Sequence, residues 1–209
     1  YQEKECDGLI SVGGGSAMDT AKGIKALLMT DIVHVRANQL PPEGKVPHLA
    51  IPGTAGTGAE TTAVAVLYED GQKLSVDHPA LLPDGVRLDG SLLDTLPEYH
   101  RKSCAMDALA QGIESWWAKK ATPGSRIHAE RAIRGVLDNL TAYLQGDRKA
   151  QDEMLHAAYE SGVAILTTRT TAAHAMSYQI TKKLGAAHGH ACMLTLPHLW
   201  AHLAAQAEY

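Results

Sequence analysis

The spacing of apolar residues changes near the middle of the chain, and this change limits the fold more than any other feature. Before about residue 97, short apolar runs such as Gly8–Val12 and His48–Pro52 are closed by glycine or proline, the pattern of buried parallel strands. From Pro97 onward, apolar residues recur at three- and four-residue spacing, which indicates helices. We therefore expect an α/β domain with a parallel sheet over 1–97 and an all-α domain over 98–209.

The individual elements follow from the same patterns. In the first half we expect a helix over 17–29, a hairpin formed by 62–69 and 72–76 around Asp70–Gly71, and a short strand over 86–89. In the second half the periodicity predicts helices over 105–119, 125–144, 150–167, 170–183 and 191–205. Thr122–Ser125 predicts a turn and helix cap, and Pro197–His198 predicts a turn.

Composition and charge restrict the class of function. The chain has 209 residues, 45% of them hydrophobic and 20% charged, as in ordinary globular proteins. A net charge of −4 gives no reason to expect nucleic acid or an anionic membrane as partner. Cys6, Cys104 and Cys192 have no CxxC spacing, which favours a reduced, cytoplasmic setting. We also expect no signal peptide and no membrane span, since no apolar run reaches about 18 residues.

A glycine-rich turn follows the first expected strand. Gly14, Gly15 and Ser16 stand between that strand and the following helix, where backbone amides and a helix N-terminus can meet a pyrophosphate. The sequence is neither GxGxxG nor GxxxxGK[ST], so a plain structural turn is an open alternative. A second small-residue loop, Thr54–Gly58, also follows a strand, and two such loops at strand ends would meet in one crevice. We favour a dinucleotide site.

Four separated residues in the helical half have the chemistry of metal ligands. Asp107 and Gln111 are four residues apart in a helical pattern, so their side chains share one face. His174 lies in a later helical segment and His188 just beyond its end. A carboxylate, an amide oxygen and two imidazoles suit Fe²⁺ or Zn²⁺. Any one of these residues alone is more often a solvated or core residue, so spacing by itself is a weak signal.

Three motifs resemble the iron-containing (group III) alcohol dehydrogenase family. They are GGGSAMDTAK at 13–22, PGTAGTGAET at 52–61 and MDALAQGIE at 106–114. The resemblance covers nearly the whole chain, although family members are considerably longer at both ends. It implies a dehydroquinate synthase-like fold, truncated at both ends here, with an α/β nucleotide domain followed by a helical metal-binding domain. It also places the family's metal ligands on Asp107, Gln111, His174 and His188, with glutamine where histidine is usual. A further family histidine falls on Tyr178.

The resemblance further implies a reaction and its participants. The expected enzyme interconverts a small aldehyde and a primary alcohol with NAD or NADP, and a divalent metal acts as Lewis acid. Asp107, His174 and His188 are the expected catalytic residues. The expected cofactor-binding residues are Gly14, Gly15, Ser16, Thr54, Thr57, Thr62 and Lys73. Partners are a small-molecule substrate and, as a candidate, a second copy of the chain in a homodimer.

The branch within the family is a narrower question. The segments ESWW at 114–117, TTAAHAMSY at 170–178 and HGH at 188–190 resemble the phosphonoacetaldehyde reductases, also called hydroxyethylphosphonate dehydrogenases. A phosphonate needs a cation, for which Arg169, Lys182 and Lys183 are candidates. Two alternatives stay open at this point: another branch acting on small alcohols or polyols, and a non-catalytic truncated remnant that only binds a partner.

Overall fold

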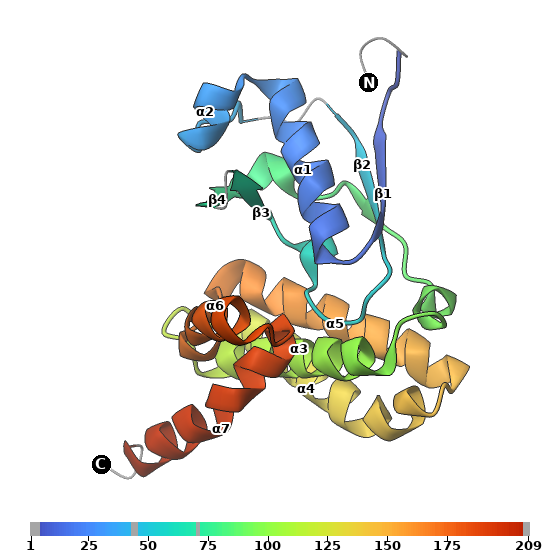
Figure 1. Cartoon of the computed structure of the whole chain (residues 1–209), viewed down its shortest axis with the longest axis vertical. Helices are drawn as coiled ribbons and strands as arrows, with labels where there is room; N and C mark the ends of the chain where they lie inside the picture. Colours follow the sequence, from blue (N-terminus) through green and yellow to red (C-terminus); the bar gives the residue numbers. More distant parts are fainter. Residues whose placement is uncertain (1–4, 43–45, 70–71, 207–209) are drawn as a thin grey trace. The chain divides into compact units, whose positions relative to one another are not determined.

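The computed structural model describes residues 5–42, 46–69 and 72–206, which fall into two compact units (Figure 1). The α/β unit comprises the chain up to residue 53 together with 59–89. The helical unit comprises 54–58 and the chain from residue 90 onward. The expected order, an α/β part with a parallel sheet followed by an all-helical part, is confirmed.

The α/β unit is built on a three-stranded parallel sheet in the order β1-β2-β5. Its elements are β1 (Leu9–Gly13), α1 (Gly15–Met29), α2 (Ile32–Arg36), β2 (His48–Pro52), η2 (Ala59–Thr61), β3 (Val64–Glu69), β4 (Gln72–Asp77), η3 (Pro79–Leu81) and β5 (Gly85–Val86). β3 and β4 form the expected antiparallel pair, whereas the expected Asp70–Gly71 turn lies outside the described residues. The short helix α2 was not predicted, because five residues are too few to show helical periodicity.

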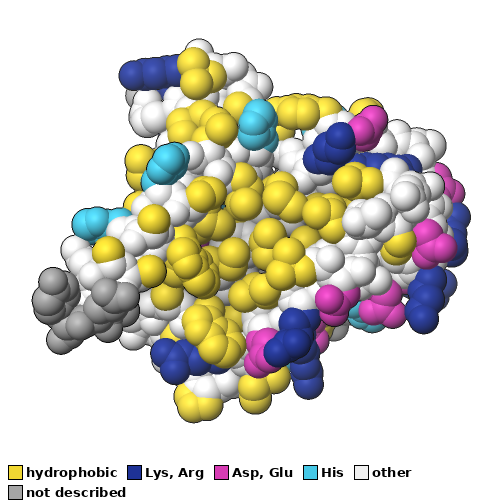
Figure 2. Space-filling model, turned by 90° about the horizontal axis from the view of Figure 1, so that it is seen from below, with side chains coloured by type: hydrophobic (Ala, Val, Ile, Leu, Met, Phe, Trp, Pro, Cys, Tyr) yellow, Lys and Arg dark blue, Asp and Glu magenta, His cyan; other side chains and the backbone are white. Residues whose placement is uncertain are grey.

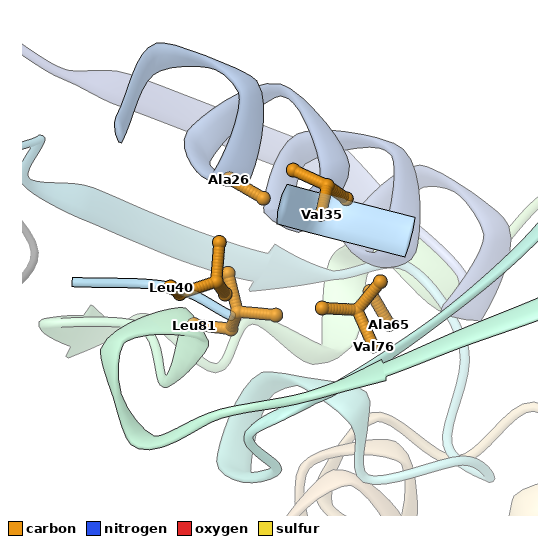
Figure 3. Close-up of a cluster of buried hydrophobic side chains, with 6 residues drawn as sticks. All are labelled: Ala26, Val35, Leu40, Ala65, Val76 and Leu81. Atoms are coloured by element: carbon orange, nitrogen blue, oxygen red, sulfur yellow. The ribbon is translucent and has the colours of Figure 1, made fainter. Parts of the chain in front are cut away.

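The core of the α/β unit lies between α1 and the β3–β4 pair. Figure 3 shows one cluster of this core, in which six buried hydrophobic side chains point toward one another. They are Ala26, Val35, Leu40, Ala65, Val76 and Leu81. Met29 and Leu74 pack against this cluster from its edge. Helix α1 contacts β1 as well as β3, so the core fixes the helix that begins at the end of β1.

Over its described residues, the helical unit has five long helices and one short one. They are η4 (Gly90–Leu93), α3 (Glu98–Trp117), α4 (Pro123–Leu144), α5 (Arg148–Thr168), α6 (Ala172–Leu184) and α7 (His188–Gln206). The predicted cap is present, because the Thr122 and Ser125 side chains each accept from the other residue's backbone amide at the start of α4. Helix α3 begins at Glu98, seven residues before the predicted start, because its first two turns carry few apolar residues.

The expected turn at Pro197–His198 is wrong, since Pro197 lies inside α7. Proline removes one backbone hydrogen bond from a helix and normally disfavours its continuation. Here Cys192 and Leu196 anchor the preceding turns in a buried cluster with Ala110 of α3 and Ala173 of α6. Tertiary packing therefore holds the helix across a residue that local preference would use to end it.

The small-residue loop 54–58 belongs to the helical unit because its glycines lie directly against helices. A Cβ atom at Gly56 would lie 2.9 Å from Cys104 Cα of α3, and one at Gly58 would lie 2.6 Å from Gly162 Cα of α5. Gly58 also has a φ of +59°, a conformation that favours glycine. The chain enters the helical unit at residue 90, ahead of the boundary expected after residue 97, because η4 packs against α5.

The helical unit exposes an extensive apolar surface. Figure 2 shows hydrophobic side chains gathered on one face, and exposed hydrophobic residues of this unit include Trp116, Leu194, Trp200 and Leu203. An exposed apolar area of this kind loses its contact with water only when another segment or molecule covers it. Among the described helices, none combines the length and the apolar character needed to cross a membrane.

Candidate metal centre and cofactor loop

Three helices bring three of the four predicted metal ligands together. Asp107 lies in α3, His174 at the start of α6 and His188 at the start of α7, and both α3 and α6 pack against α7 (Figure 1). Ligand atoms of these three residues and of Cys192 all lie within 4.8 Å of one another. Asp107, His174 and Cys192 are buried, whereas His188 is half-buried. In this structure a carboxylate, two imidazoles and a thiol thus point to one common position.

Gly189 makes this convergence feasible. A Cβ atom at this position would lie 2.0 Å from the backbone oxygen of Ser103 and 2.8 Å from Asp107 Cβ. Real Cβ atoms do not approach other atoms this closely, so only glycine lets the first turn of α7 lie against α3. The His190 amide then donates to Ser103 Oγ at 3.1 Å, which fixes the contact. His188 and Asp107 face each other for this reason.

Glu114 sets the orientation of His174. The Nδ1 nitrogen of His174 donates to Glu114 Oε2, and Glu114 Oε1 accepts from Thr171 Oγ1 at 2.6 Å and from the Ala173 amide at 2.8 Å. With a hydrogen on Nδ1, the imidazole directs Nε2 toward Asp107 Oδ1, 3.2 Å away. A carboxylate behind a ligand histidine is the usual way in which proteins fix the ring and raise its basicity toward metal.

Ser177 does the same for His188. Its hydroxyl donates to the backbone oxygen of His174 at 2.7 Å, so its oxygen accepts the hydrogen bond from His188 Nδ1 at 3.1 Å. The hydrogen on Nδ1 leaves the lone pair of the ring on Nε2, which lies 3.9 Å from Asp107 Oδ1. Tyr178 stacks on His188 with ring centroids 5.8 Å apart. Both histidines therefore present Nε2 to the same carboxylate.

The electrostatics of the cluster favour a positive charge at its centre. Burial opposes charge on Glu114, yet hydrogen bonds from His174 and Thr171 hold the pKa of its carboxyl below the ordinary value. Burial likewise opposes charge on His174, but hydrogen bonds with Asp107, Cys192 and Glu114 raise its pKa to about 12. His174 lies between the carboxylates of Glu114 and Asp107, and a cation bound at this point would meet their negative charge.

Donor type and spacing fit a divalent ion of intermediate hardness. Four donors around a tetrahedral zinc lie roughly 3.3–3.8 Å apart, as bond lengths of about 2.0–2.3 Å require. The donors in this structure lie within 4.8 Å of one another, so the widest separation has to shorten by about 1.0–1.5 Å to reach that geometry. Imidazole, carboxylate and thiol are all donors that Zn²⁺ or Fe²⁺ accepts.

Gln111, the fourth ligand expected from the resemblance, has hydrogen bonds at both ends of its amide. Its Nε2 donates to the backbone oxygen of Thr57 at 3.1 Å, and its Oε1 accepts from Ser161 Oγ at 2.8 Å. The side chain is buried and ties loop 54–58 to α3 and α5. A role of Gln111 in metal binding stays a prediction.

Cys192 is the donor that sequence reasoning missed. It follows His188 by four residues in α7, the same spacing that singled out Asp107 and Gln111 in α3. That spacing was a usable signal, but a cysteine without a CxxC partner was interpreted only as evidence for a reduced setting. The side chain is fully buried and its sulfur is one of the four donor atoms of the group.

The predicted phosphate-binding turn lies in the α/β unit at the end of β1. Gly13 has a φ of +144°, which excludes other residues, and its oxygen accepts from the Gly53 amide at 2.7 Å. A Cβ atom at Gly53 would lie 3.2 Å from Gly13 Cα, so the ends of the neighbouring parallel strands β1 and β2 nearly touch. Helix α1 starts immediately beyond, with Gly14 as a cap that has no side chain to occupy the first amides. Gly15 and Ser16 form its first turn, where an anion binds favourably.

A buried lysine holds the segment after the second loop in place. Lys22 of α1 donates to the backbone oxygens of Ala59 at 2.6 Å and Val64 at 2.9 Å, and to Thr62 Oγ1 at 3.1 Å. Burial lowers the pKa of Lys22 to about 8, and burial raises the pKa of nearby Glu60 to about 7. The hydroxyl of Thr62 is thus part of a structural network, and its contact with a cofactor stays a prediction.

The other expected cofactor residues are spread over both units. Thr54 and Thr57 are half-buried in loop 54–58 of the helical unit. Lys73 lies in β4 opposite Tyr68, and its side chain lies outside the described part of the structure. Cofactor contacts of these three residues stay predictions as well.

Comparison with known proteins identifies the family. The model of the iron-containing alcohol dehydrogenases matches residues 1–90, and that of the C-terminal part of Fe-containing alcohol dehydrogenases matches residues 102–208. The chain belongs to the iron-containing alcohol dehydrogenase family, as its motifs predicted.

Similar proteins include two that are named as aldehyde reductases. Phosphonoacetaldehyde reductase of Streptomyces viridochromogenes is 36% identical over 208 residues, which cover 92% of this chain and 52% of that protein. Sulfoacetaldehyde reductase of Bifidobacterium kashiwanohense, solved in complex with NAD⁺, is 32% identical with a TM-score of 0.89, covering 95% of this chain and 55% of that one. An iron-containing alcohol dehydrogenase of Thermococcus thioreducens has a TM-score of 0.90 at 30% identity, covering 100% and 57%. The chain spans about half the length of these relatives.

Proposed function

We propose that this protein is a metal-dependent, NAD(P)-linked oxidoreductase that interconverts a small aldehyde and a primary alcohol. The single observation that carries the proposal is the convergence of Asp107, His174 and His188, with each imidazole oriented by its own hydrogen-bond partner. Family membership supports NAD or NADP as cofactor and iron as one metal of the class. Fe²⁺ and Zn²⁺ both suit the donors.

Each residue has a defined task in this proposal. When bound, a divalent ion at this point supplies Lewis-acid polarisation of a carbonyl, and a reduced nicotinamide supplies hydride. Asp107 contributes the negative charge that holds the ion, and the Nε2 atoms of His174 and His188 contribute neutral donors. Glu114 and Ser177 keep these rings in position. In the α/β unit, the amides of Gly15 and Ser16 hold the pyrophosphate of the cofactor.

The proposed substrate is a two-carbon aldehyde with an anionic group, with phosphonoacetaldehyde and its alcohol 2-hydroxyethylphosphonate as the favoured pair. Two similar proteins are named for phosphonoacetaldehyde and sulfoacetaldehyde, which share this chemistry. Arg169, Lys182 and Lys183 are exposed cations near the ends of α5 and α6 and are candidates to meet the anion. A lactaldehyde reductase of Escherichia coli, 32% identical, supports uncharged aldehydes as the alternative.

Metal analysis combined with an activity assay tests the core of the proposal. The purified protein, loaded with Zn²⁺ or Fe²⁺ and dialysed, is expected to retain one metal ion per chain and to oxidise reduced cofactor when aldehyde is added. A chelator should abolish both. His188→Ala should lose the metal, whereas His198→Ala, which changes an exposed histidine of the same helix, should retain it. Equal metal content in both variants would overturn the site.

A substrate panel tests the narrower part. Turnover of phosphonoacetaldehyde, sulfoacetaldehyde, lactaldehyde and acetaldehyde is compared at equal concentration with NADH and with NADPH. The proposal predicts the highest kcat/KM for one of the two anionic aldehydes. A preference for lactaldehyde or acetaldehyde would assign the protein to a different substrate class within the same reaction.

A further inference from the structure

We propose that the thiol of Cys192 is a protein ligand of the metal, so that the ligand set is Asp107, His174, His188 and Cys192. The inference rests on the proposed metal-dependent function, because it concerns how the same site is completed. It changes the chemical character of the site, since a thiolate brings a second negative charge and a soft donor.

The position of Cys192 carries the inference. Its sulfur is one of four donor atoms that all lie within 4.8 Å of one another, and the side chain is fully buried. Cys192 stands one helical turn beyond His188, so both side chains project from α7 on the same side. A buried thiol aimed at two imidazoles and a carboxylate therefore lies at the same point as the other ligands.

Gln111 and Cys192 compete for the same role, and their surroundings differ. The Gln111 amide donates to Thr57 at one end and accepts from Ser161 at the other, so metal binding would have to add to or replace these contacts. The Cys192 sulfur lies within 4.8 Å of donor atoms of Asp107, His174 and His188. Metal binding at Cys192 therefore uses an atom that already lies in the donor group, whereas metal binding at Gln111 involves an amide that holds a loop.

A simpler role for Cys192 is packing. The residue lies in an apolar cluster with Ala110, Ala173 and Leu196, and buried cysteines often serve as small hydrophobic residues. The two roles differ in one observable: a packing cysteine leaves only nitrogen and oxygen around the metal, whereas a ligand places sulfur there. A direct view of the metal's neighbours therefore decides between them.

X-ray absorption of the Zn²⁺-loaded protein provides this view. The proposal predicts one sulfur neighbour at about 2.3 Å beside nitrogen and oxygen at about 2.0–2.1 Å. With Co²⁺ in place of Zn²⁺, it also predicts an intense thiolate-to-metal charge-transfer band in the near ultraviolet. Cys192→Ser should remove both signals. It should also weaken Zn²⁺ binding about tenfold or more, at least as much as the loss of a side chain that only supports a ligand.

Two further variants sharpen the experiment. Cys104→Ser changes a cysteine of α3 outside the donor group and should keep the sulfur signals, as should Gln111→Ala. If Cys192→Ser fails to fold, the spectra of the unchanged protein and of Gln111→Ala still decide the question. One bound metal with only nitrogen and oxygen neighbours would overturn the role of Cys192 and leave the proposed function standing. No bound metal at all would overturn both.

Discussion

The helical unit and the α/β unit prepare their sites in opposite ways. In the helical unit, side chains converge, and Glu114 and Ser177 hold the rings of His174 and His188 by hydrogen bonds. In the α/β unit, the loop at Gly13–Ser16 offers backbone amides and the absence of side chains. The metal centre therefore depends on functional groups of side chains, whereas the loop at Gly13–Ser16 depends on glycines that leave the backbone accessible.

This difference teaches which substitutions each site is sensitive to. Removal of a functional group should damage the metal centre, because each donor has its own supporting partner. Addition of a Cβ substituent should damage the cofactor loop, because the ligand needs close approach to the backbone. Gly189 is the exception within the helical unit, since there the metal centre also depends on a missing side chain.

The largest effect is expected for Gly189→Ala. The added methyl group would lie 2.0 Å from the backbone oxygen of Ser103, so α7 must move away from α3. We expect a loss of about 3 kcal/mol or more in the free energy of unfolding and loss of bound metal. Gly124→Ala is the matched control, because a Cβ atom at Gly124 would lie 3.8 Å from Thr122 Oγ1, an ordinary contact distance. Denaturant unfolding and metal analysis test this; equal stability of both variants would contradict the tight contact.

The second-largest effect is expected for a substitution in the α/β unit, and it concerns cofactor affinity alone. Gly15→Val is expected to weaken binding of reduced cofactor about 100-fold or more, because the side chain occupies the space needed by the pyrophosphate at the start of α1. Metal content should stay unchanged, since the donors lie in the other unit. Cofactor fluorescence titration measures the affinity. An unchanged Kd in a folded variant would mean that the glycines only form a turn.

A smaller effect separates metal ligands from their supports. Glu114→Gln should reduce metal affinity about 10- to 100-fold, because an amide holds the His174 ring less strongly and adds no negative charge. Glu160→Gln is the control, since Glu160 also accepts from a histidine, His128 Nδ1 at 2.5 Å, but outside the donor group. Calorimetric Zn²⁺ titration compares the two. Equal losses of metal affinity in the two variants would indicate that Glu114→Gln acts through the stability of the fold and not through the metal site.

The smallest effect is expected for Ser177→Ala. Loss of the hydroxyl removes the acceptor for His188 Nδ1 but leaves the ring stacked on Tyr178. Metal affinity should fall by about tenfold, the smallest loss expected when a residue that supports a metal ligand is removed. The same titration measures it, and a loss larger than that of Glu114→Gln would show that the two supports have been ranked wrongly.

Much of this architecture could be predicted from local patterns. The strands, the glycine turns and four of the five long helices follow from apolar spacing within a few residues of their observed ends. Helix α3 was predicted too short, because Glu98 and its neighbours are polar and periodicity alone does not register them. Pro197 was interpreted as a turn, because local preference carries no information about the packing of Leu196.

The candidate site was harder to predict, because its contacts join distant parts of the chain. Family motifs singled out Asp107, His174 and His188, and the structure brings their donor atoms together. Glu114 was visible only as part of a motif, since nothing in the sequence shows that it faces a residue 60 positions away. Cys192 shares a helix face with His188, but that pattern gains meaning only when α7 is placed against α3.

The central claim is that Asp107 and the two histidines around it bind one metal ion, and metal stoichiometry of Asp107→Ala tests it most directly. Asp107 Oδ1 lies 3.2 Å from His174 Nε2 and 3.9 Å from His188 Nε2, so its removal takes away the shared centre of the site. After Zn²⁺ loading and dialysis, elemental analysis should give about one ion per chain in the unchanged protein and close to none in the variant. Equal zinc content in a folded Asp107→Ala protein would contradict the claim.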